Sequence, residues 1–207
     1  MGNSFLWGRK IGSDKRDALA VPSDSTLATL EPYLPSKDLI TPASPLAQAE
    51  SHNNSLYPFT TLTFATSLDS ALSLSPGTQT ILSGGSSKAL THYLRSRHDA
   101  IFVGVGTVIA DNPSLNCRCS NVSGYGGQGN SLNSQPRPVV VDPTLRWDIE
   151  RDNGKPWKIV ELVREGRGRA PWIVTAMREE DIPTVKREFL ESLGGKFISV
   201  GEKDRFR

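Results

Sequence analysis

The stretch that decides the fold runs from Asp99 to Arg118 and reads Asp-Ala-Ile-Phe-Val-Gly-Val-Gly-Thr-Val-Ile-Ala-Asp-Asn-Pro-Ser-Leu-Asn-Cys-Arg. Residues 100–105 are almost continuously apolar, a pattern typical of a strand buried on both faces of a parallel sheet. Gly104 and Gly106 stand where this strand should end, and ligands of open α/β sheets bind beyond the carboxyl ends of strands. Glycine there lets the backbone turn tightly and leaves no Cβ in the way of a ligand.

The spacing of these glycines resembles a dinucleotide-binding motif only in part. Ile109 stands where such a motif would carry its third small residue. Backbone N–H groups that open a helical turn at Thr107 would suit a phosphate or pyrophosphate. The same spacing also fits a strand turn with purely structural glycines, and the residues alone leave both interpretations open.

Alternation of apolar residues and turn signals predicts further elements on both sides of this stretch. The expected strands cover residues 59–65, 139–143, 172–175 and 196–200, with a short extended piece at 79–82 and helices over 88–98 and 181–193. Strand, helix and strand in repeated order indicate parallel pairing with crossover helices. The predicted fold class is therefore α/β, three-layered, with a mostly parallel sheet.

Composition restricts the class of protein further. The chain has 207 residues, of which 37% are hydrophobic and 22% charged, enough for one folded domain with appendages. The formal net charge of +2 is too small to indicate nucleic acid or a membrane as the main partner. Apolar runs fall well short of the roughly 20 residues that cross a bilayer. The two cysteines suit a reducing compartment, so we expect a cytoplasmic protein.

The chain divides into two regions by composition. Residues 1–56 are rich in Ser, Pro, Ala and Thr and are expected to form a largely disordered leader, with at most a short helical turn on the body. Residues 57–207 are expected to form the folded domain. Within it, residues 119–135 are rich in Gly, Ser and Asn and are expected to form a surface insertion.

Several polar side chains are candidates for a site. Arg95 and Arg118 could converge on one anion, because a guanidinium offers a planar fork of donors that matches phosphate oxygens. They could equally be two solvated surface arginines. Asp69 and Asp142 each follow a predicted strand and could bind a ligand hydroxyl or cap a turn, the commoner role.

The sulfur and imidazole groups predict no metal site. Cys117 and Cys119 have too few companions for zinc, and His52, His92 and His98 lie at no ligand spacing. We expect ordinary thiols.

Taken together, four blocks of the chain resemble a known family. The blocks are residues 59–69 (Phe-Thr-Thr-Leu-Thr-Phe-Ala-Thr-Ser-Leu-Asp), 90–95 (Leu-Thr-His-Tyr-Leu-Arg), 104–118, and 136–147, which begins Pro-Arg-Pro. They resemble the pyrimidine reductases of riboflavin biosynthesis, most closely the fungal enzymes for 2,5-diamino-6-ribosylamino-4(3H)-pyrimidinone 5′-phosphate. That family is similar in fold to dihydrofolate reductase. The resemblance covers roughly residues 57–200.

The resemblance implies hydride transfer from NADPH to the ribosyl C1′, which opens the sugar to a ribitylamino chain without a metal. It also implies a homodimer. Together with the two glycines above, the expected cofactor contacts are Ile81, Gly104, Gly106, Thr107, Asp111 and Val200, and the expected substrate contacts are Gln79, Arg95, Leu115 and Arg118. The proton could come from water or a carboxylic acid, and the sequence identifies no catalytic donor.

The chain departs from this family at its C-terminal end. Family members continue past the last strand with a helix, a strand and a Glu-Gly-Gly-type loop for the cofactor phosphates, whereas only residues 201–207 follow here. The chain is therefore expected to be truncated and weak or inactive alone. Two alternatives stay open: an inactive or regulatory relative that binds a phosphorylated ligand or a partner chain, and a generic nucleotide-binding module.

Overall fold

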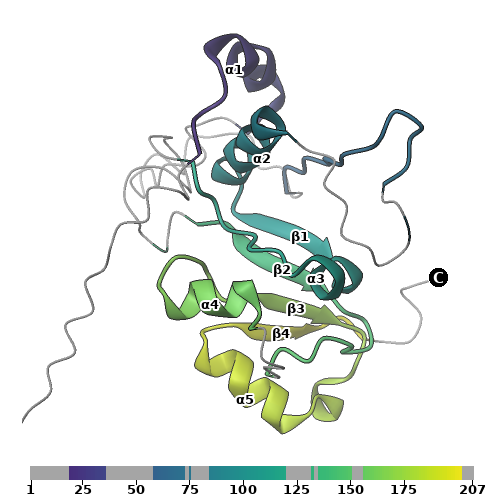
Figure 1. Cartoon of the computed structure of the whole chain (residues 1–207). Helices are drawn as coiled ribbons and strands as arrows, with labels where there is room; N and C mark the ends of the chain where they lie inside the picture. Colours follow the sequence, from purple (N-terminus) through teal and green to yellow (C-terminus); the bar gives the residue numbers. More distant parts are fainter. Residues whose placement is uncertain are drawn as a thin grey trace, which may run out of the picture.

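The computed structural model describes most of the chain from residue 19 onward (Figure 1). The described residues are 19–35, 58–72, 75, 84–119, 132, 135–150 and 156–201. The sheet has four strands in the order β1-β2-β3-β4, and each strand is parallel to its neighbour. The strands are β1 (Ala100–Gly104), β2 (Arg137–Val141), β3 (Trp172–Thr175) and β4 (Lys196–Ser199). The predicted α/β class with parallel pairing is confirmed.

Helices provide the crossovers between the strands. The helices around the sheet are α2 (Gly85–Ser96), α3 (Val105–Asp111), α4 (Lys158–Arg164), the 3-10 turn η5 (Glu179–Asp181) and α5 (Thr184–Ser192). In Figure 1, α5 lies beside β4 at one edge of the sheet and α2 lies beyond β1 at the other. Helix α4 is the crossover from β2 to β3, and the sequence patterns did not predict it.

The main apolar core lies between the sheet and these helices. Val140 on β2, Ile173 on β3 and Leu190 on α5 are each 2% exposed or less. Trp147, in the loop after β2, is equally buried and meets the Trp157 ring edge-on at a centroid distance of 5.7 Å. This core fixes the start of α4, which borders the cavity described below.

Two expectations about strands are wrong. Residues 58–72 are neither strand nor helix, and Leu62 and Phe64 point their side chains to solvent. An alternating sequence forms a strand only where another strand can pair with it. Among the described residues, no strand pairs with residues 58–72. The second error concerns β1, whose Phe102 is 68% exposed. This exposure shows that β1 is not buried on both faces, and in the described part of the chain β1 pairs with β2 alone, at the edge of the sheet.

The N-terminal segment, defined here as residues 19–35, folds against α2. It contains the helix α1 (Asp24–Leu30) and the 3-10 turn η2 (Glu31–Tyr33). Ser23 caps α1, since its Oγ accepts a hydrogen bond from the Thr26 N–H. A second apolar cluster joins Leu34 of this segment to Tyr93, Cys117 and Cys119. The N-terminal segment therefore packs directly against the residues on either side of Arg118.

No helix within the described ranges is long and apolar enough to cross a bilayer.

Candidate functional site

The segment that follows α3, residues 112–119, carries most of the candidate site. It starts at Asn112, which has a left-handed backbone (φ 43°) and ends the helix. Its side chain then ties the segment to α4: Oδ1 accepts from the Lys158 N–H at 2.9 Å and Nδ2 donates to the Pro156 carbonyl at 3.1 Å. Asn112 therefore satisfies a donor at the start of α4 that the helix itself leaves open.

Replacing Asn112 with alanine should lower the free energy of unfolding by about 1 kcal/mol, the usual cost of losing such a cap. The matched variant Asn112→Asp keeps an acceptor for the Lys158 N–H and loses only the hydrogen bond to Pro156. Its free energy of unfolding should therefore fall by less than that of Asn112→Ala. Urea denaturation followed by circular dichroism measures both. Equal losses would show that the cap to Lys158 contributes little.

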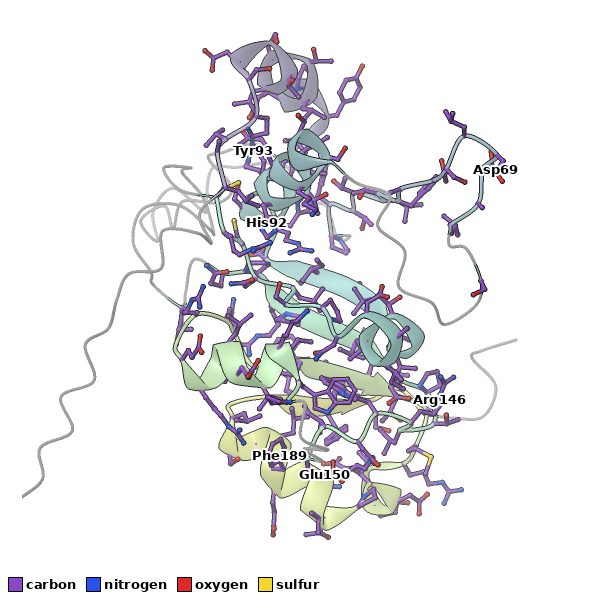
Figure 2. All side chains as sticks on the ribbon, in the orientation of Figure 1. Asp69, His92, Tyr93, Arg146, Glu150 and Phe189 are labelled. Atoms are coloured by element: carbon purple, nitrogen blue, oxygen red, sulfur yellow. The ribbon has the colours of Figure 1, made fainter. Side chains whose placement is uncertain are left out.

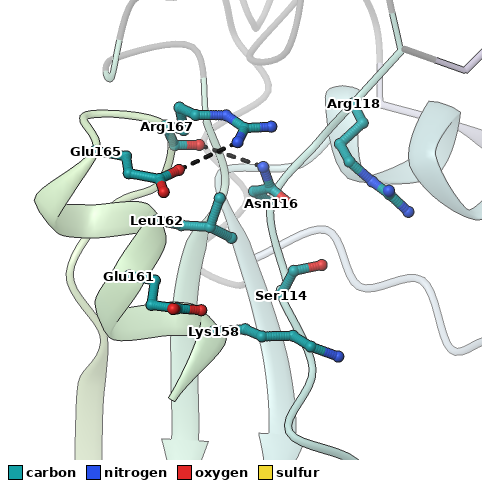
Figure 3. Close-up of a pocket in the computed structure, with 8 residues that line it drawn as sticks. All are labelled: Ser114, Asn116, Arg118, Lys158, Glu161, Leu162, Glu165 and Arg167. Carbon is teal, nitrogen blue, oxygen red and sulfur yellow. Dashed lines mark hydrogen bonds and ion pairs between the residues drawn. The ribbon is translucent and has the colours of Figure 1, made fainter. Parts of the chain in front are cut away.

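A cavity of about 360 Å³ lies between this segment and α4 (Figure 3). Its lining residues are Ser114, Asn116, Arg118, Lys158, Glu161, Leu162, Glu165 and Arg167. Arg167 pairs with Glu165 at 3.1 Å, and both groups are substantially exposed, so this pair is of little energetic value. The cavity thus offers three cationic side chains, two carboxylates and two neutral hydrogen-bonding groups, a lining suited to a polar, charged ligand.

The two arginines that the sequence singled out lie near each other. Arg95, on α2, donates from Nη1 to the Asn116 carbonyl at 3.0 Å. Burial lowers the pKa of Arg95 to about 10; the charge interaction with the Cys117 side chain opposes this shift and the charge of Arg118 adds to it. Arg95 Nε is buried and has no hydrogen-bond partner in the described part of the chain. Two guanidinium groups that repel each other in a partly buried place favour binding of an anion.

His92 accepts a hydrogen bond from the backbone of Arg118. The Arg118 N–H donates to His92 Nδ1 at 3.0 Å, and the ring is 4% exposed. Burial is the main cause that lowers the pKa of His92; a hydrogen bond with the Cys117 side chain opposes it, and the charges of Arg95 and Arg118 lower the pKa further. The imidazole is therefore neutral at physiological pH. Figure 2 places it on α2 on the side toward the sheet.

The two thiols on either side of Arg118 point toward α2. Cys117 donates to the His92 carbonyl at 3.2 Å, and Cys119 to the Ala89 carbonyl at 3.7 Å. Both are free and buried. The N-terminal segment covers them, and the Leu19 N–H donates to the Arg118 carbonyl at 3.0 Å. These contacts fix the backbone on both sides of Arg118.

The predicted cofactor residues lie around α3. Thr107 is exposed there, and Asp111 is half-buried at the end of the helix. Gly104 and Gly106 keep negative φ, and a Cβ at either would meet nothing within 4 Å. The chain therefore does not need glycine for a tight turn at these positions, and the space beside them is open. None of the four borders the cavity.

The remaining predicted residues divide as follows. Leu115 has a left-handed backbone and is 3% exposed, so its side chain belongs to the core and not to the cavity surface. Val200 is 37% exposed just after β4. Gln79 and Ile81 lie outside the described residues. Of the predicted substrate contacts that the structure describes, Arg118 alone borders the cavity, and Arg95 reaches the neighbouring Asn116 carbonyl.

The two aspartates cap turns. Asp142 is 1% exposed and accepts from the Arg146 and Trp147 N–H groups, both at 2.9 Å. Asp69 accepts from the Ser67 hydroxyl, and this hydrogen bond lowers the pKa of its carboxyl. The alternative in which either binds a ligand hydroxyl is not needed to explain its position.

Sequence reasoning missed Lys158 and Asn116 on the cavity wall and the role of His92. Lys158 gave no signal, because it belongs to a helix that was not predicted. His92 was considered only as a metal ligand or a base, and its spacing to Arg95 on one helix, three residues, was the available signal.

Comparison with known proteins gives a consistent result. The family model for the RibD C-terminal domain matches residues 58–199. The 2,5-diamino-6-ribosylamino-4(3H)-pyrimidinone 5′-phosphate reductase of Debaryomyces hansenii is 39% identical over 147 residues, which are 69% of this chain and 53% of the relative. The reductase of the same name from Saccharomyces cerevisiae is 38% identical over 146 residues, 70% of this chain and 53% of the relative.

A solved structure is also similar. The riboflavin biosynthesis reductase of Saccharomyces cerevisiae aligns with a TM-score of 0.55 and 28% identity, over 87% of this chain and 60% of the solved one. The parallel sheet with crossover helices defines the class, an α/β domain with a polar, charged cavity between residues 112–119 and α4. The chain belongs to the RibD C-terminal domain family, whose fungal relatives here are reductases by name. It spans about half the length of the curated relatives it matches.

Proposed function

We propose that the chain binds and reduces 2,5-diamino-6-ribosylamino-4(3H)-pyrimidinone 5′-phosphate, with NADPH as the hydride donor, in riboflavin biosynthesis. In this reaction a hydride reaches the ribosyl C1′ and the sugar opens to a ribitylamino chain. The observation that carries the proposal is the proximity of Arg95 to Arg118, which borders a polar cavity, in a chain whose relatives are named for this reaction.

The phosphate end of the substrate is assigned to the arginines. Arg118 borders the cavity, and Arg95 Nε is a buried donor that still needs an acceptor. A phosphate monoester carries nearly two negative charges at neutral pH and three acceptor oxygens, so it would satisfy this donor and offset the repulsion between the guanidiniums.

The cofactor is assigned to the open space around α3. A Cβ at Gly104 or Gly106 would meet nothing within 4 Å, and Thr107 is exposed beside them, so the residues present leave room for a nucleotide. The nicotinamide supplies the hydride when bound. The chain's own residues then have two tasks, to hold Thr107 and Asp111 against the cofactor and to fix the phosphate so that the sugar carbon is correctly oriented.

A second candidate function is binding of a phosphorylated ligand without reduction. It is favoured by the position of Thr107 and Asp111, neither of which borders the cavity that contains Arg118. Under this alternative the phosphate site works alone, and the chain acts as a regulatory relative or binds a partner chain. Homodimerisation and a cytoplasmic location remain predictions.

Calorimetric titration distinguishes the proposed reductase from a chain that only binds a phosphorylated ligand. If the first proposal is right, NADPH and D-ribose 5-phosphate both bind, and reduced nicotinamide is consumed when the aminopyrimidine substrate is added. If only the sugar phosphate binds, the second candidate is supported. D-Ribose is the matched control for the phosphate, and binding of neither ligand would contradict both.

A further inference from the structure

We propose that Cys117 and Cys119 form a dithiol modification site, that a peroxide oxidises this pair to a disulfide, and that the disulfide weakens anion binding at Arg118. These are the two cysteines of the chain, and both are free and buried. Formation of the disulfide does not depend on the proposed function, whereas its effect on Arg118 rests on the proposed phosphate site.

The two thiols lie together against one face of α2. Cys117 Sγ donates to the His92 carbonyl at 3.2 Å. Cys119 Sγ donates to the Ala89 carbonyl, three residues earlier on the same helix, at 3.7 Å. The two side chains are also hydrogen-bonded to each other. Their Cα atoms, two residues apart, are separated by at most about 7 Å, close to the upper end of the range that disulfides span. A disulfide therefore needs only a short movement of two sulfurs that already interact.

The hydrogen bond between the thiols makes them chemically unequal. It is the main cause that lowers the pKa of Cys117; burial opposes it, and a hydrogen bond with the His92 side chain lowers the pKa further. The same hydrogen bond raises the pKa of Cys119, and burial raises it more. The thiolate is the nucleophilic form of cysteine, so Cys117 is the attacking thiol and Cys119 resolves the product.

The oxidation takes two steps with hydrogen peroxide as the oxidant. The Cys117 thiolate attacks one peroxide oxygen, the O–O bond breaks, hydroxide leaves, and a sulfenic acid forms. The Cys119 sulfur then attacks the sulfenic sulfur, so that the S–S bond forms and the S–O bond breaks. The second hydroxide leaves and takes up the Cys119 proton. The thiols lose two electrons in total, and the peroxide is reduced to two water molecules.

The N-terminal segment controls access to this pair. Cys117 and Cys119 are only 5% and 6% exposed, and Leu34 of the segment packs in one apolar cluster with them. The ion pair between Glu31 and Arg97 holds the segment in place. Peroxide therefore reaches the thiols when the segment opens locally, and weaker attachment of the segment should speed the oxidation.

The disulfide acts on the residue between the two cysteines. In the reduced chain the Arg118 N–H donates to His92 Nδ1 at 3.0 Å. Drawing the sulfurs together to a bond of about 2 Å turns the backbone between them. It also removes both S–H donors, so the hydrogen bonds to α2 are lost. Arg118 then changes its direction relative to Arg95 on α2, and an anion that needs both guanidiniums is bound more weakly.

Mass spectrometry of the intact chain tests the modification site. The folded, reduced full chain is treated with hydrogen peroxide, then unfolded and alkylated with N-ethylmaleimide. Because the sequence has two cysteines, the untreated chain should take two alkyl groups. The oxidised monomer should take none until dithiothreitol reduces it. Uptake of one group, gain of oxygen atoms without a disulfide, or a disulfide that links two chains would overturn the proposal.

Two serine variants test the separate tasks of the thiols. Cys119→Ser keeps a hydrogen-bond donor beside Cys117 and removes the resolving sulfur, so Cys117 should gain oxygen atoms and form no disulfide. In Cys117→Ser, the remaining thiol should react at least about tenfold more slowly than Cys117 does in Cys119→Ser. Equal rates would overturn the assignment of Cys117 as the attacking thiol.

A variant of the N-terminal segment tests the access route. Glu31→Ala should speed oxidation of the folded chain at least about tenfold, because it raises the open fraction of the segment. The matched control Glu180→Ala removes an exposed carboxylate far along the chain and should leave the rate unchanged. Equal rates in the two variants would show that the segment does not limit access.

Calorimetric titration of the reduced and oxidised chains tests the effect on Arg118. Oxidation should weaken binding of D-ribose 5-phosphate at least about tenfold, and dithiothreitol should restore it. Peroxide-treated Cys117→Ser is the control and should keep the affinity that it has untreated. Equal affinities of the reduced and oxidised chains would overturn the effect on Arg118. Failure of the reduced chain to bind the sugar phosphate would instead overturn the proposed phosphate site, while the mass measurement would still decide whether the disulfide forms.

Discussion

Replacing Arg118 with methionine should weaken binding of D-ribose 5-phosphate at least about 100-fold, because the bidentate, charge-assisted contact to the phosphate is lost while side-chain length and packing are largely kept. Arg118 borders the cavity and lies close enough to Arg95 for their charges to interact. Arg118→Lys should bind D-ribose 5-phosphate about tenfold more weakly than the unmodified chain, a smaller effect than that of Arg118→Met. An ammonium keeps the charge but not the planar set of donors.

The control for this prediction is Arg178→Met. Arg178 is 70% exposed and pairs at the surface with Glu180, so its loss should leave affinity and stability nearly unchanged. Calorimetry on the three variants gives the affinities, and thermal unfolding verifies that each is folded. A folded Arg118→Met chain that binds the sugar phosphate as tightly as the unmodified chain would exclude Arg118 from the phosphate site.

Replacing Glu31 with alanine should lower the free energy of unfolding by about 2–3 kcal/mol, since it leaves the Arg97 guanidinium buried with its charge uncompensated. Arg97 is 1% exposed, and its Nη1 donates to both carboxylate oxygens of Glu31, at 2.7 and 2.8 Å. Burial alone would lower the pKa of Arg97, but the hydrogen bonds with Glu31 and Tyr93 outweigh it and raise that pKa. The carboxylate is 30% exposed, which keeps the expected loss below that of a fully buried pair.

Two further variants serve as controls for Glu31→Ala. Glu180→Ala removes an exposed carboxylate from a surface pair and should cost less than about 0.5 kcal/mol. The double variant Glu31→Leu with Arg97→Met should regain much of the lost stability, because an apolar pair needs no compensating charge. Urea unfolding of all three measures the free energies. If Glu31→Ala is as stable as Glu180→Ala, the ion pair does not anchor the N-terminal segment.

This ion pair also shows what composition leaves out for the N-terminal segment. A Ser- and Pro-rich stretch predicts little structure beyond a short helical turn on the body, and residues 24–33 form α1 and η2. Their stability depends on partners about 60 residues away in sequence, Tyr93 and Arg97, which local composition does not report.

The same distinction applies to the strand predictions. Residues 172–175 have strong local apolar character and form β3 as expected. Residues 59–65 alternate equally clearly and do not form a strand, because strand formation needs a paired neighbour and not only a suitable sequence.

By itself, the sequence determined the parallel α/β class, the helix before β1, and the approximate ends of β2, β3, β4 and α5, because hydrophobic period is a local property. It also singled out Arg95 and Arg118 as candidates by their chemistry, and their role stays a prediction. Tertiary structure decided which groups meet. It placed Lys158 and Asn116 on one cavity wall, moved Leu115 into the core, and set His92 Nε2 against Arg118. Such contacts join residues far apart in the chain, and their energies depend on burial and on neighbouring charges that exist only after folding.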